Sequence, residues 1–137
     1  MRPIKFRAKK HWDGIWVYGC YFYGYTYFRR QKEKAHYILH YKDDVLAKDL
    51  YCDDEIDEKT LGQYTGLNDK NGVEIYEGDI VDCENRGAPR FIIEFDNRWH
   101  GFNLMFDDAC ETSPMCSNNL EVIGNIYDNP ELMKGEI

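Results

Sequence analysis

The sequence predicts a mainly β protein made of antiparallel hairpins, and three observations point to this fold class. Aromatic residues make up 15% of the 137 residues, with 11 Tyr, 7 Phe and 3 Trp, and aromatic side chains favour sheets over helices. The apolar runs are short and place apolar residues at every second position, as half-buried strands do. Gly, Asn and Asp, which favour tight turns, separate these runs.

The first residues predict an antiparallel hairpin. Ile4–Ala8 alternates apolar and basic residues, and Ile15–Gly19 is mostly apolar, so both are predicted strands. Asp13-Gly14 supplies a turn between them, and the short separation favours antiparallel pairing.

An aromatic strand follows this hairpin. Between Tyr18 and Phe28 aromatic residues occupy both faces of an extended segment. Such a strand is either covered on both faces, by its own domain and by a second chain, or it displays rings to a ligand. We favour coverage, because contiguous exposed apolar patches usually mark interfaces. Gly19 and Gly24 indicate a bulge or a close backbone approach.

A charged tip and an acidic segment complete the N-terminal part. Arg29–Lys34 predicts a solvated hairpin tip, and the alternating residues Ala35–Tyr41 predict a strand that pairs with the aromatic one. Residues 43–58 hold two acidic clusters. They predict a solvated loop, because the glycine and ligand spacing of a calcium loop is missing. Thr60–Leu67 is a predicted short strand.

The densest turn signals lie between Gly62 and Val81, in the stretch GQYTGLNDKNGVEIYEGDIV. Predicted turns at Thr65-Gly66, Asn68–Gly72 and Glu77-Gly78-Asp79 flank the short strands Val73–Tyr76 and Ile80–Cys83. Asn71-Gly72 predicts a two-residue primed turn, since both residues accept positive φ.

The remaining residues predict a meander. The expected strands are Arg90–Phe95, Trp99–Phe106 and Leu120–Tyr127, with a turn at Asp96-Asn97 and an irregular loop over Asp107–Asn119. Gly124 would allow the bend that closes a small barrel. Asn129-Pro130-Glu131 predicts one helical turn, with Asn as the cap and Pro at the first helical position.

Three blocks of the sequence carry a family resemblance. They are IKFRAKKHWDGIWVYG from Ile4 to Gly19, the turn-rich stretch from Gly62 to Val81, and EVIGNIYDNPEL from Glu121 to Leu132. In this order and at these distances the blocks resemble the YopX family of prophage and phage proteins over essentially the whole chain.

The resemblance implies a fold and a context. It implies a single YopX-like unit over residues 1–137, with N-terminal antiparallel hairpins joined to a small SH3-like barrel and a short C-terminal helical turn. We place the aromatic and basic hairpins in residues 1–55 and the barrel part in residues 56–137. The resemblance implies a phage-derived gene and supplies no enzymatic activity.

Composition limits the class of protein. No apolar run is long enough to cross a bilayer, and the N-terminus lacks the apolar core of a signal peptide, so we expect a protein of the host cytoplasm without a membrane partner. The five scattered cysteines are expected to be reduced and mostly buried or half-buried: Cys20, Cys52, Cys83, Cys110 and Cys116.

No catalytic, metal or cofactor motif stands out. The histidines at positions 11, 36, 40 and 100 do not fall beside a nucleophile in a known arrangement. Cys110 and Cys116 lack the second close pair of ligands that structural zinc needs. A phosphate-binding glycine loop is also missing. We therefore expect a protein that is not an enzyme, with no catalytic residues, metal or cofactor.

Two functions remain, and charge bears on both. Residues 1–34 hold nine Lys or Arg against two acidic residues, whereas the remainder holds 8 basic and 23 acidic residues. The favoured hypothesis is a self-associating protein-interaction module, a homo-oligomer that also meets a phage or host protein. The alternative is nucleic-acid binding through stacking tyrosines and nearby cations. Its candidate contacts are Tyr21, Tyr23, Tyr25, Tyr27, Arg29, Arg30, Lys32 and Lys34.

Overall fold

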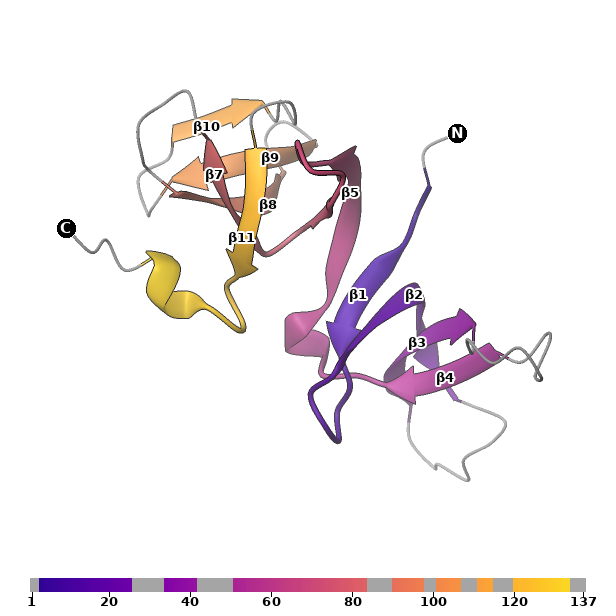
Figure 1. Ribbon diagram of the computed structural model, residues 1–137. Helices are drawn as coiled ribbons and strands as arrows, with labels where there is room; N and C mark the ends of the chain where they lie inside the picture. The colour runs from indigo at the N-terminus through magenta and orange to yellow at the C-terminus, as the bar shows by residue number, and fades with distance from the viewer. Residues whose placement is uncertain are drawn as a thin grey trace. The chain divides into compact units, whose positions relative to one another are not determined.

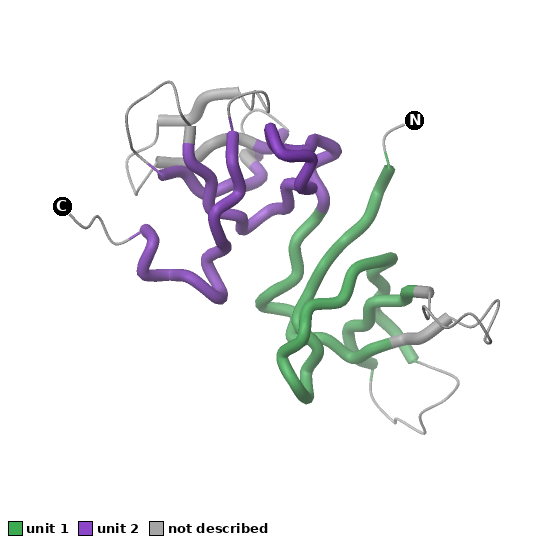
Figure 2. The backbone as a smooth tube through the Cα atoms, viewed as in Figure 1, with its two compact units in different colours: residues 1–63 green, residues 64–137 purple. Residues whose placement is uncertain are grey.

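A computed structural model shows a mainly β protein in which every strand pair of the described residues is antiparallel. The structure describes residues 3–25, 34–41, 51–83, 90–97, 101–106, 111–114 and 120–133. Within them the chain forms two compact units, residues 1–63 and 64–137 (Figure 2). The sequence analysis divided the chain after residue 55, and each unit is considered by itself below.

Unit 1 contains the predicted N-terminal hairpins (Figure 1). Its elements are β1 (Phe6–Lys9), β2 (Trp16–Gly24), β3 (Ala35–Tyr41), β4 (Tyr51–Glu55), the 3₁₀ turn η1 (Glu58–Thr60) and the start of β5 (Gly62–Asn68). The predicted strand Ala35–Tyr41 is confirmed with the same bounds, and it pairs with β2 as expected. Ala8, Val17, Ile38 and Ile56 form the buried core of the unit.

Gly19 confirms one expectation about the aromatic strand, and Gly24 does not. A Cβ atom on Gly19 would lie 2.1 Å from the carbonyl oxygen of Leu39 on β3, a distance that no real Cβ atom tolerates. Around Gly24 the same test finds no atom within 4 Å. The close approach of two backbones therefore occurs at Gly19 alone.

Part of the predicted acidic loop is instead a strand. β4 pairs with β3 at the edge of the six-stranded sheet, whose order is β4-β3-β2-β1-β5-β6. The carboxylates of this segment obscured its strand character, because they interrupt the apolar alternation by which a strand is recognised. Residues 43–50 of the predicted loop lie outside the described residues.

Unit 2 holds the rest of β5 and a sheet of five described strands. Its further elements are β6 (Glu74–Tyr76), β7 (Asp79–Cys83), β8 (Arg90–Asp96), β9 (Gly101–Phe106), β10 (Glu111–Pro114), β11 (Leu120–Asn125) and the 3₁₀ turn η4 (Pro130–Met133). The order β10-β9-β8-β7-β11 leaves this sheet open at β10 and β11 in the described residues. Its core contains Ile75, Val81, Phe91, Ile93 and Leu120.

Two turn predictions in the central stretch were wrong in detail. Gly66 has φ 88° but lies inside β5, at the register shift between β5 and β6, so Thr65-Gly66 is a bulge within a strand. The next hairpin has a three-residue loop in which Gly72, at φ 83°, is the left-handed residue. Its bonds run from Gly72 N–H to Asp69 O and from Asp69 N–H to Val73 O. It is therefore not the predicted two-residue primed turn.

The carboxylate of Asp69 explains the loop type. Its Oδ1 accepts the backbone N–H groups of Asn71 and Val73 at 2.8 and 2.9 Å. Its Oδ2 accepts the N–H of Val122 at 2.9 Å, beside the register shift of β11 at Val122 and Gly124. One buried side chain thus shapes the turn and attaches it to the edge of the other sheet.

Two further expectations are tested near the C-terminus. The predicted irregular loop over Asp107–Asn119 contains β10, which pairs with β9; its polar sequence hid an edge strand. The expected helical turn is present as the 3₁₀ turn η4. Asn129 lies at the expected N-cap position, since its backbone carbonyl accepts the N–H of Leu132 at 3.1 Å, and its Oδ1 accepts the N–H of Asn125 at 3.4 Å.

Candidate functional site

The candidate site lies on the β2–β3 hairpin, where half of the sequence-predicted contacts are described. Tyr21, Tyr23 and Tyr25 follow one another at alternate positions, and Lys34 directly precedes β3. The other predicted contacts, Tyr27, Arg29, Arg30 and Lys32, lie outside the described residues.

The pairing of β2 with β3 places a histidine beside these tyrosines. Tyr23 is directly opposite His36, and Tyr21 is opposite Ile38. Because residues at alternate positions of a strand share a face, Tyr21, Tyr23 and His36 lie on the same face of the sheet as the core residue Ile38.

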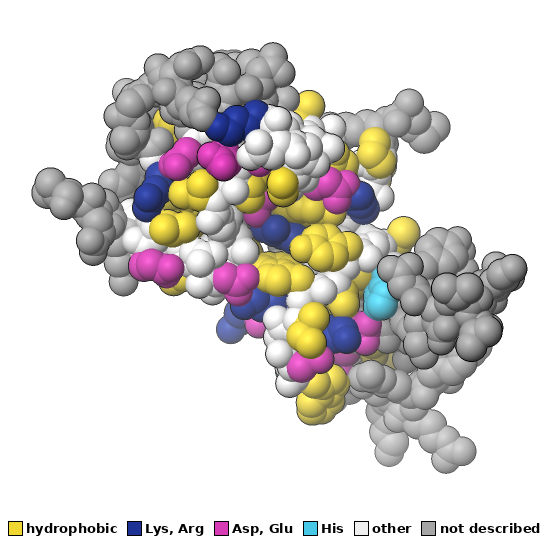
Figure 3. Space-filling model, viewed as in Figure 1, with side chains coloured by type: hydrophobic (Ala, Val, Ile, Leu, Met, Phe, Trp, Pro, Cys, Tyr) yellow, Lys and Arg dark blue, Asp and Glu magenta, His cyan; other side chains and the backbone are white. Residues whose placement is uncertain are grey.

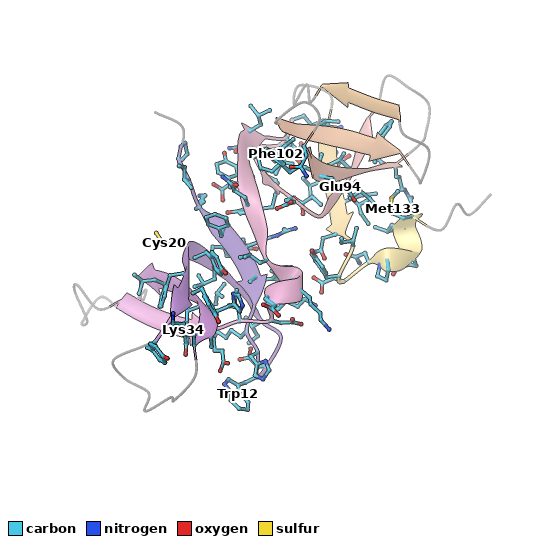
Figure 4. The ribbon with its side chains drawn as sticks, turned by 180° about the vertical axis from the view of Figure 1, so that it is seen from behind. Trp12, Cys20, Lys34, Glu94, Phe102 and Met133 are labelled. Atoms are coloured by element: carbon cyan, nitrogen blue, oxygen red, sulfur yellow. The ribbon has the colours of Figure 1, made fainter. Side chains whose placement is uncertain are left out.

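Lys34 and two exposed tyrosines form what we call the tyrosine platform. Tyr23 and Tyr25 are each 58% exposed. The Lys34 Nζ lies 6.0 Å from the ring centroid of each tyrosine, so two rings flank one ammonium group. Lys34 lies beside the strands of unit 1 in Figure 4, whereas Trp12 lies at the tip of the β1–β2 turn. The 6.0 Å between the Lys34 Nζ and each ring centroid is at the outer limit of a cation–π contact.

His36 is held through both of its ring nitrogens. Its Nε2 lies 2.5 Å from the Glu58 carboxylate, and its Nδ1 lies 2.6 Å from the Tyr21 hydroxyl. An ionised carboxylate only accepts hydrogen bonds, so Nε2 carries a proton. In the neutral imidazole Nδ1 is then the acceptor, and Tyr21 donates its O–H to it. The ring of His36 also lies 4.6 Å from the ring of Tyr23.

The surroundings of Tyr21 keep its hydroxyl protonated. Burial raises the pKa of Tyr21 above its ordinary value, and the negative charge of Glu58 and the neighbouring Tyr23 act in the same direction. Tyr21 is therefore a hydrogen-bond donor in this network over the neutral range. An activated nucleophile would need the opposite shift.

Sequence reasoning missed the roles of His36 and Glu58. It considered His36 only as a member of a catalytic pair and Glu58 only as part of an acidic cluster. In the β2–β3 register Ala35 is opposite Gly24, and His36 is therefore opposite Tyr23. A prediction of this register from the sequence would have identified His36 as the neighbour of Tyr23. Glu58 comes from η1, and no local sequence signal indicates its approach to His36.

The opposite side of the same strands carries a second group of rings, which we call the aromatic face. Alternation places on it Trp16, Tyr18, Cys20 and Phe22 of β2, Tyr37 of β3 and Arg7 of β1. Phe22 stacks on Tyr37 at 5.2 Å, and the Arg7 guanidinium lies 4.7 Å from the Trp16 ring centroid. Tyr18 is 48% exposed.

The cysteine and histidine chemistry of the described residues is limited. Cys20 is a free and exposed thiol; the side chains of the other four cysteines lie outside the described residues, so the expectation that most cysteines are buried or half-buried stays a prediction. His40 forms a second histidine–carboxylate pair, with Asp54 at 2.6 Å. Among the described residues no group of three or more His, Cys, Asp or Glu could hold a metal ion. No helix in the same residues is long and apolar enough to cross a membrane.

These features describe a small, mainly β protein that presents tyrosines and cations on a hairpin. The chain belongs to the YopX family, since the family model for the YopX protein matches residues 5–134. A search of curated proteins found no match.

A comparison with solved structures agrees on the fold. The crystal structure of protein EF1440 from Enterococcus faecalis is 24% identical, with a TM-score of 0.50, and the match covers 97% of this chain and 99% of that chain. At this identity the likeness concerns the fold alone.

Proposed function

We propose that this protein is a non-enzymatic, self-associating interaction module encoded by a phage or prophage. One observation carries the proposal: unit 1 exposes most of the large apolar side chains that the described residues leave in water. Six of the nine belong to residues 3–25, namely Ile4, Trp12, Ile15, Tyr18, Tyr23 and Tyr25, and of these Tyr18 lies on the aromatic face. Exposed apolar surface of this kind marks interaction sites. In Figure 3 hydrophobic side chains reach the surface beside lysine and arginine side chains.

The occupant that we propose for the aromatic face is a second copy of this chain. Arg7 is buried beside the Trp16 ring, at 4.7 Å and only 6% exposed, so the half-buried Lys9, at 5.5 Å from the same ring, is the cation that this face offers. Unit 2 holds 15 acidic residues against five basic ones, whereas unit 1 holds 10 against 12. A neighbouring copy therefore supplies the complementary charge. The phage context of the family supports a phage or host protein as a further partner.

We also propose that unit 2 is the SH3-like barrel that the family resemblance implies. The β5–β6 turn supports this proposal, because it bonds to the outer edge of β11. Lys70 N–H donates to Leu120 O at 3.0 Å, and Val122 N–H donates to the Asp69 carboxylate. Bonds of this kind bring the hairpin against an edge strand, as barrel closure requires.

Light scattering after size exclusion tests the self-association. We expect the mass of the wild-type chain to rise with protein concentration and to fall toward that of one chain at high salt, because exposed charge pairs are screened. Tyr18→Asp should give a single chain at all concentrations, since association would bury an unpaired charge.

A matched variant in unit 2 provides the control. Phe95 is an exposed aromatic residue on β8, 44% exposed, so Phe95→Asp makes the same chemical change away from the aromatic face. It should associate like the wild type. A wild-type protein that remains a single chain at every concentration would contradict the proposal, as would equal losses in both variants.

A further inference from the structure

We propose that the tyrosine platform binds an unpaired nucleic-acid strand, with bases stacked on Tyr23 and Tyr25 and a phosphate contacting Lys34. This function is distinct from self-association through the aromatic face. It rests on the exposure of the two rings, on one ammonium group at the same distance from both, and on the contacts that hold the His36 ring beside Tyr23.

The two rings are accessible and share one cation. Each is 58% exposed and lies 6.0 Å from the Lys34 Nζ. Tyr23 and Tyr25 are two positions apart, and such residues on an extended strand are separated by about 7 Å. Successive bases of a flexible single strand can therefore reach one ring each, and stacking does not require a particular base.

His36 supports the platform from behind. Glu58 at 2.5 Å and Tyr21 at 2.6 Å fix both ring nitrogens of His36. The ring of His36 lies 4.6 Å from that of Tyr23 and is tilted by 31°. Because these contacts restrict Tyr23 before any ligand arrives, a base that stacks on its other side costs less conformational entropy.

Lys34 is the group of the platform that can contact a phosphate backbone. Lys34 carries three N–H donors and is exposed. The first 34 residues contain nine Lys or Arg and two acidic residues, although the whole chain has a net charge of −8. Of the charged groups described at the platform, Lys34 is the cation that can contact a phosphate, and the Glu58 carboxylate is bonded to His36. Binding should weaken as salt rises, because each neutralised phosphate releases counterions.

The platform and the aromatic face do not compete for the same side chains. Tyr23 lies on the core side of β2, opposite His36, whereas Tyr18 lies on the aromatic face. Substitutions at the two tyrosines therefore separate the two functions. Loss of nucleic-acid binding with unchanged mass identifies the platform, and loss of mass with unchanged binding identifies the aromatic face.

Fluorescence anisotropy of the full chain with labelled oligonucleotides tests the proposal. The probes are oligo-dT and oligo-rU of about 15 nucleotides, which matches the site size of small single-strand binders, and a DNA duplex of equal length. We expect both single strands to bind at low salt more tightly than the duplex. The double variant Tyr23→Leu and Tyr25→Leu should bind at least about tenfold more weakly, since each stack contributes to affinity.

Matched variants distinguish stacking from general charge and from misfolding. Tyr23→Phe with Tyr25→Phe keeps the rings and should bind like the wild type, and Tyr18→Leu should also leave binding unchanged. Lys34→Met should reduce the salt dependence of the affinity by about one phosphate contact. No binding of either single strand at low salt would overturn the proposal. Unchanged binding in the double leucine variant, or an equal loss in Tyr18→Leu, would also overturn it.

Discussion

The two units use polar side chains in opposite ways. In unit 2 the buried carboxylates of Asp69 and Asp79, 6% and 1% exposed, accept backbone N–H groups and fix tight turns. In unit 1 the polar groups of Tyr21, His36 and Glu58 bond to one another beside exposed rings. The comparison indicates that unit 2 is shaped by its turns, while unit 1 leaves aromatic rings exposed.

The largest expected effect is in unit 2. Asp69→Ala leaves the N–H groups of Asn71, Val73 and Val122 without their acceptor. Because hydrogen bonds to a charged group contribute more than neutral ones, the loss of three of them should cost about 3 kcal/mol in the free energy of unfolding. Urea denaturation measures it. Glu94→Ala, at an exposed position on β8, is the control and should change stability little; equal losses would contradict the role of Asp69.

A second effect tests the packing of unit 1. Gly19→Ala places a methyl group 2.1 Å from the Leu39 carbonyl oxygen, so β2 and β3 must separate. We expect a loss of about 2 kcal/mol in stability, as for other overpacked sites. Gly24→Ala on the same strand meets nothing within 4 Å and should be nearly neutral in the same thermal unfolding measurement. Similar values for the two variants would show that the strands do not approach closely at Gly19.

A third, smaller effect tests the histidine network. Tyr21→Phe removes the hydroxyl that bonds to His36 Nδ1 and keeps the ring. The expected loss is about 1 kcal/mol, the usual net value of a hydrogen bond. Tyr18→Phe, on the opposite face, should lose less. If Tyr21→Phe matches the wild type in chemical denaturation, the hydroxyl does not hold His36.

The smallest expected effects are changes in stability at low and at high pH. The low-pH effect involves Asp69 of unit 2, and the high-pH effect involves Tyr21 of unit 1. Burial alone would raise the pKa of Asp69, but bonds from Val122, Val73 and Asn71 outweigh it, and its pKa is lowered. Its stabilisation is therefore present above about pH 4 and is lost as pH falls through the lowered pKa. The pKa of Tyr21 is raised, so its pH dependence has the opposite sign. The stability that Tyr21 contributes is present below about pH 10 and is lost as pH rises through the raised pKa.

Stability measured against pH in two variants tests these assignments. Asp69→Asn should remove part of the acid-side loss and Tyr21→Phe part of the alkaline loss. An unchanged acid limb in Asp69→Asn would show that other carboxylates account for it.

Much of the fold could be predicted from the sequence, because alternation and turn residues are local signals. β3 was placed to the residue, and β7, β8 and β11 within a few residues. β4 and β10 were missed, since edge strands in polar segments lack apolar alternation. The hairpin loop type was wrong because the Asp69 carboxylate, rather than Asn71-Gly72 alone, determines it.

The candidate site was only partly predictable. The tyrosines were predicted as candidate contacts because they recur along one predicted strand, and Lys34 because it lies in the charged segment that follows. The spacing of two between the tyrosines predicts that they share a face. The support from Glu58 depends on how η1 returns to β3. Such a contact is set by tertiary packing, and the sequence around either residue does not indicate it.

The most direct test of the central claim, that a second copy covers the aromatic face, uses the thiol of Cys20. This exposed cysteine lies on that face between Tyr18 and Phe22. Its rate of modification by a thiol reagent, followed at that position by mass spectrometry, should fall as protein concentration rises. In Tyr18→Asp it should stay at the rate of the dilute wild type. A Cys20 rate that is independent of wild-type concentration would contradict the account.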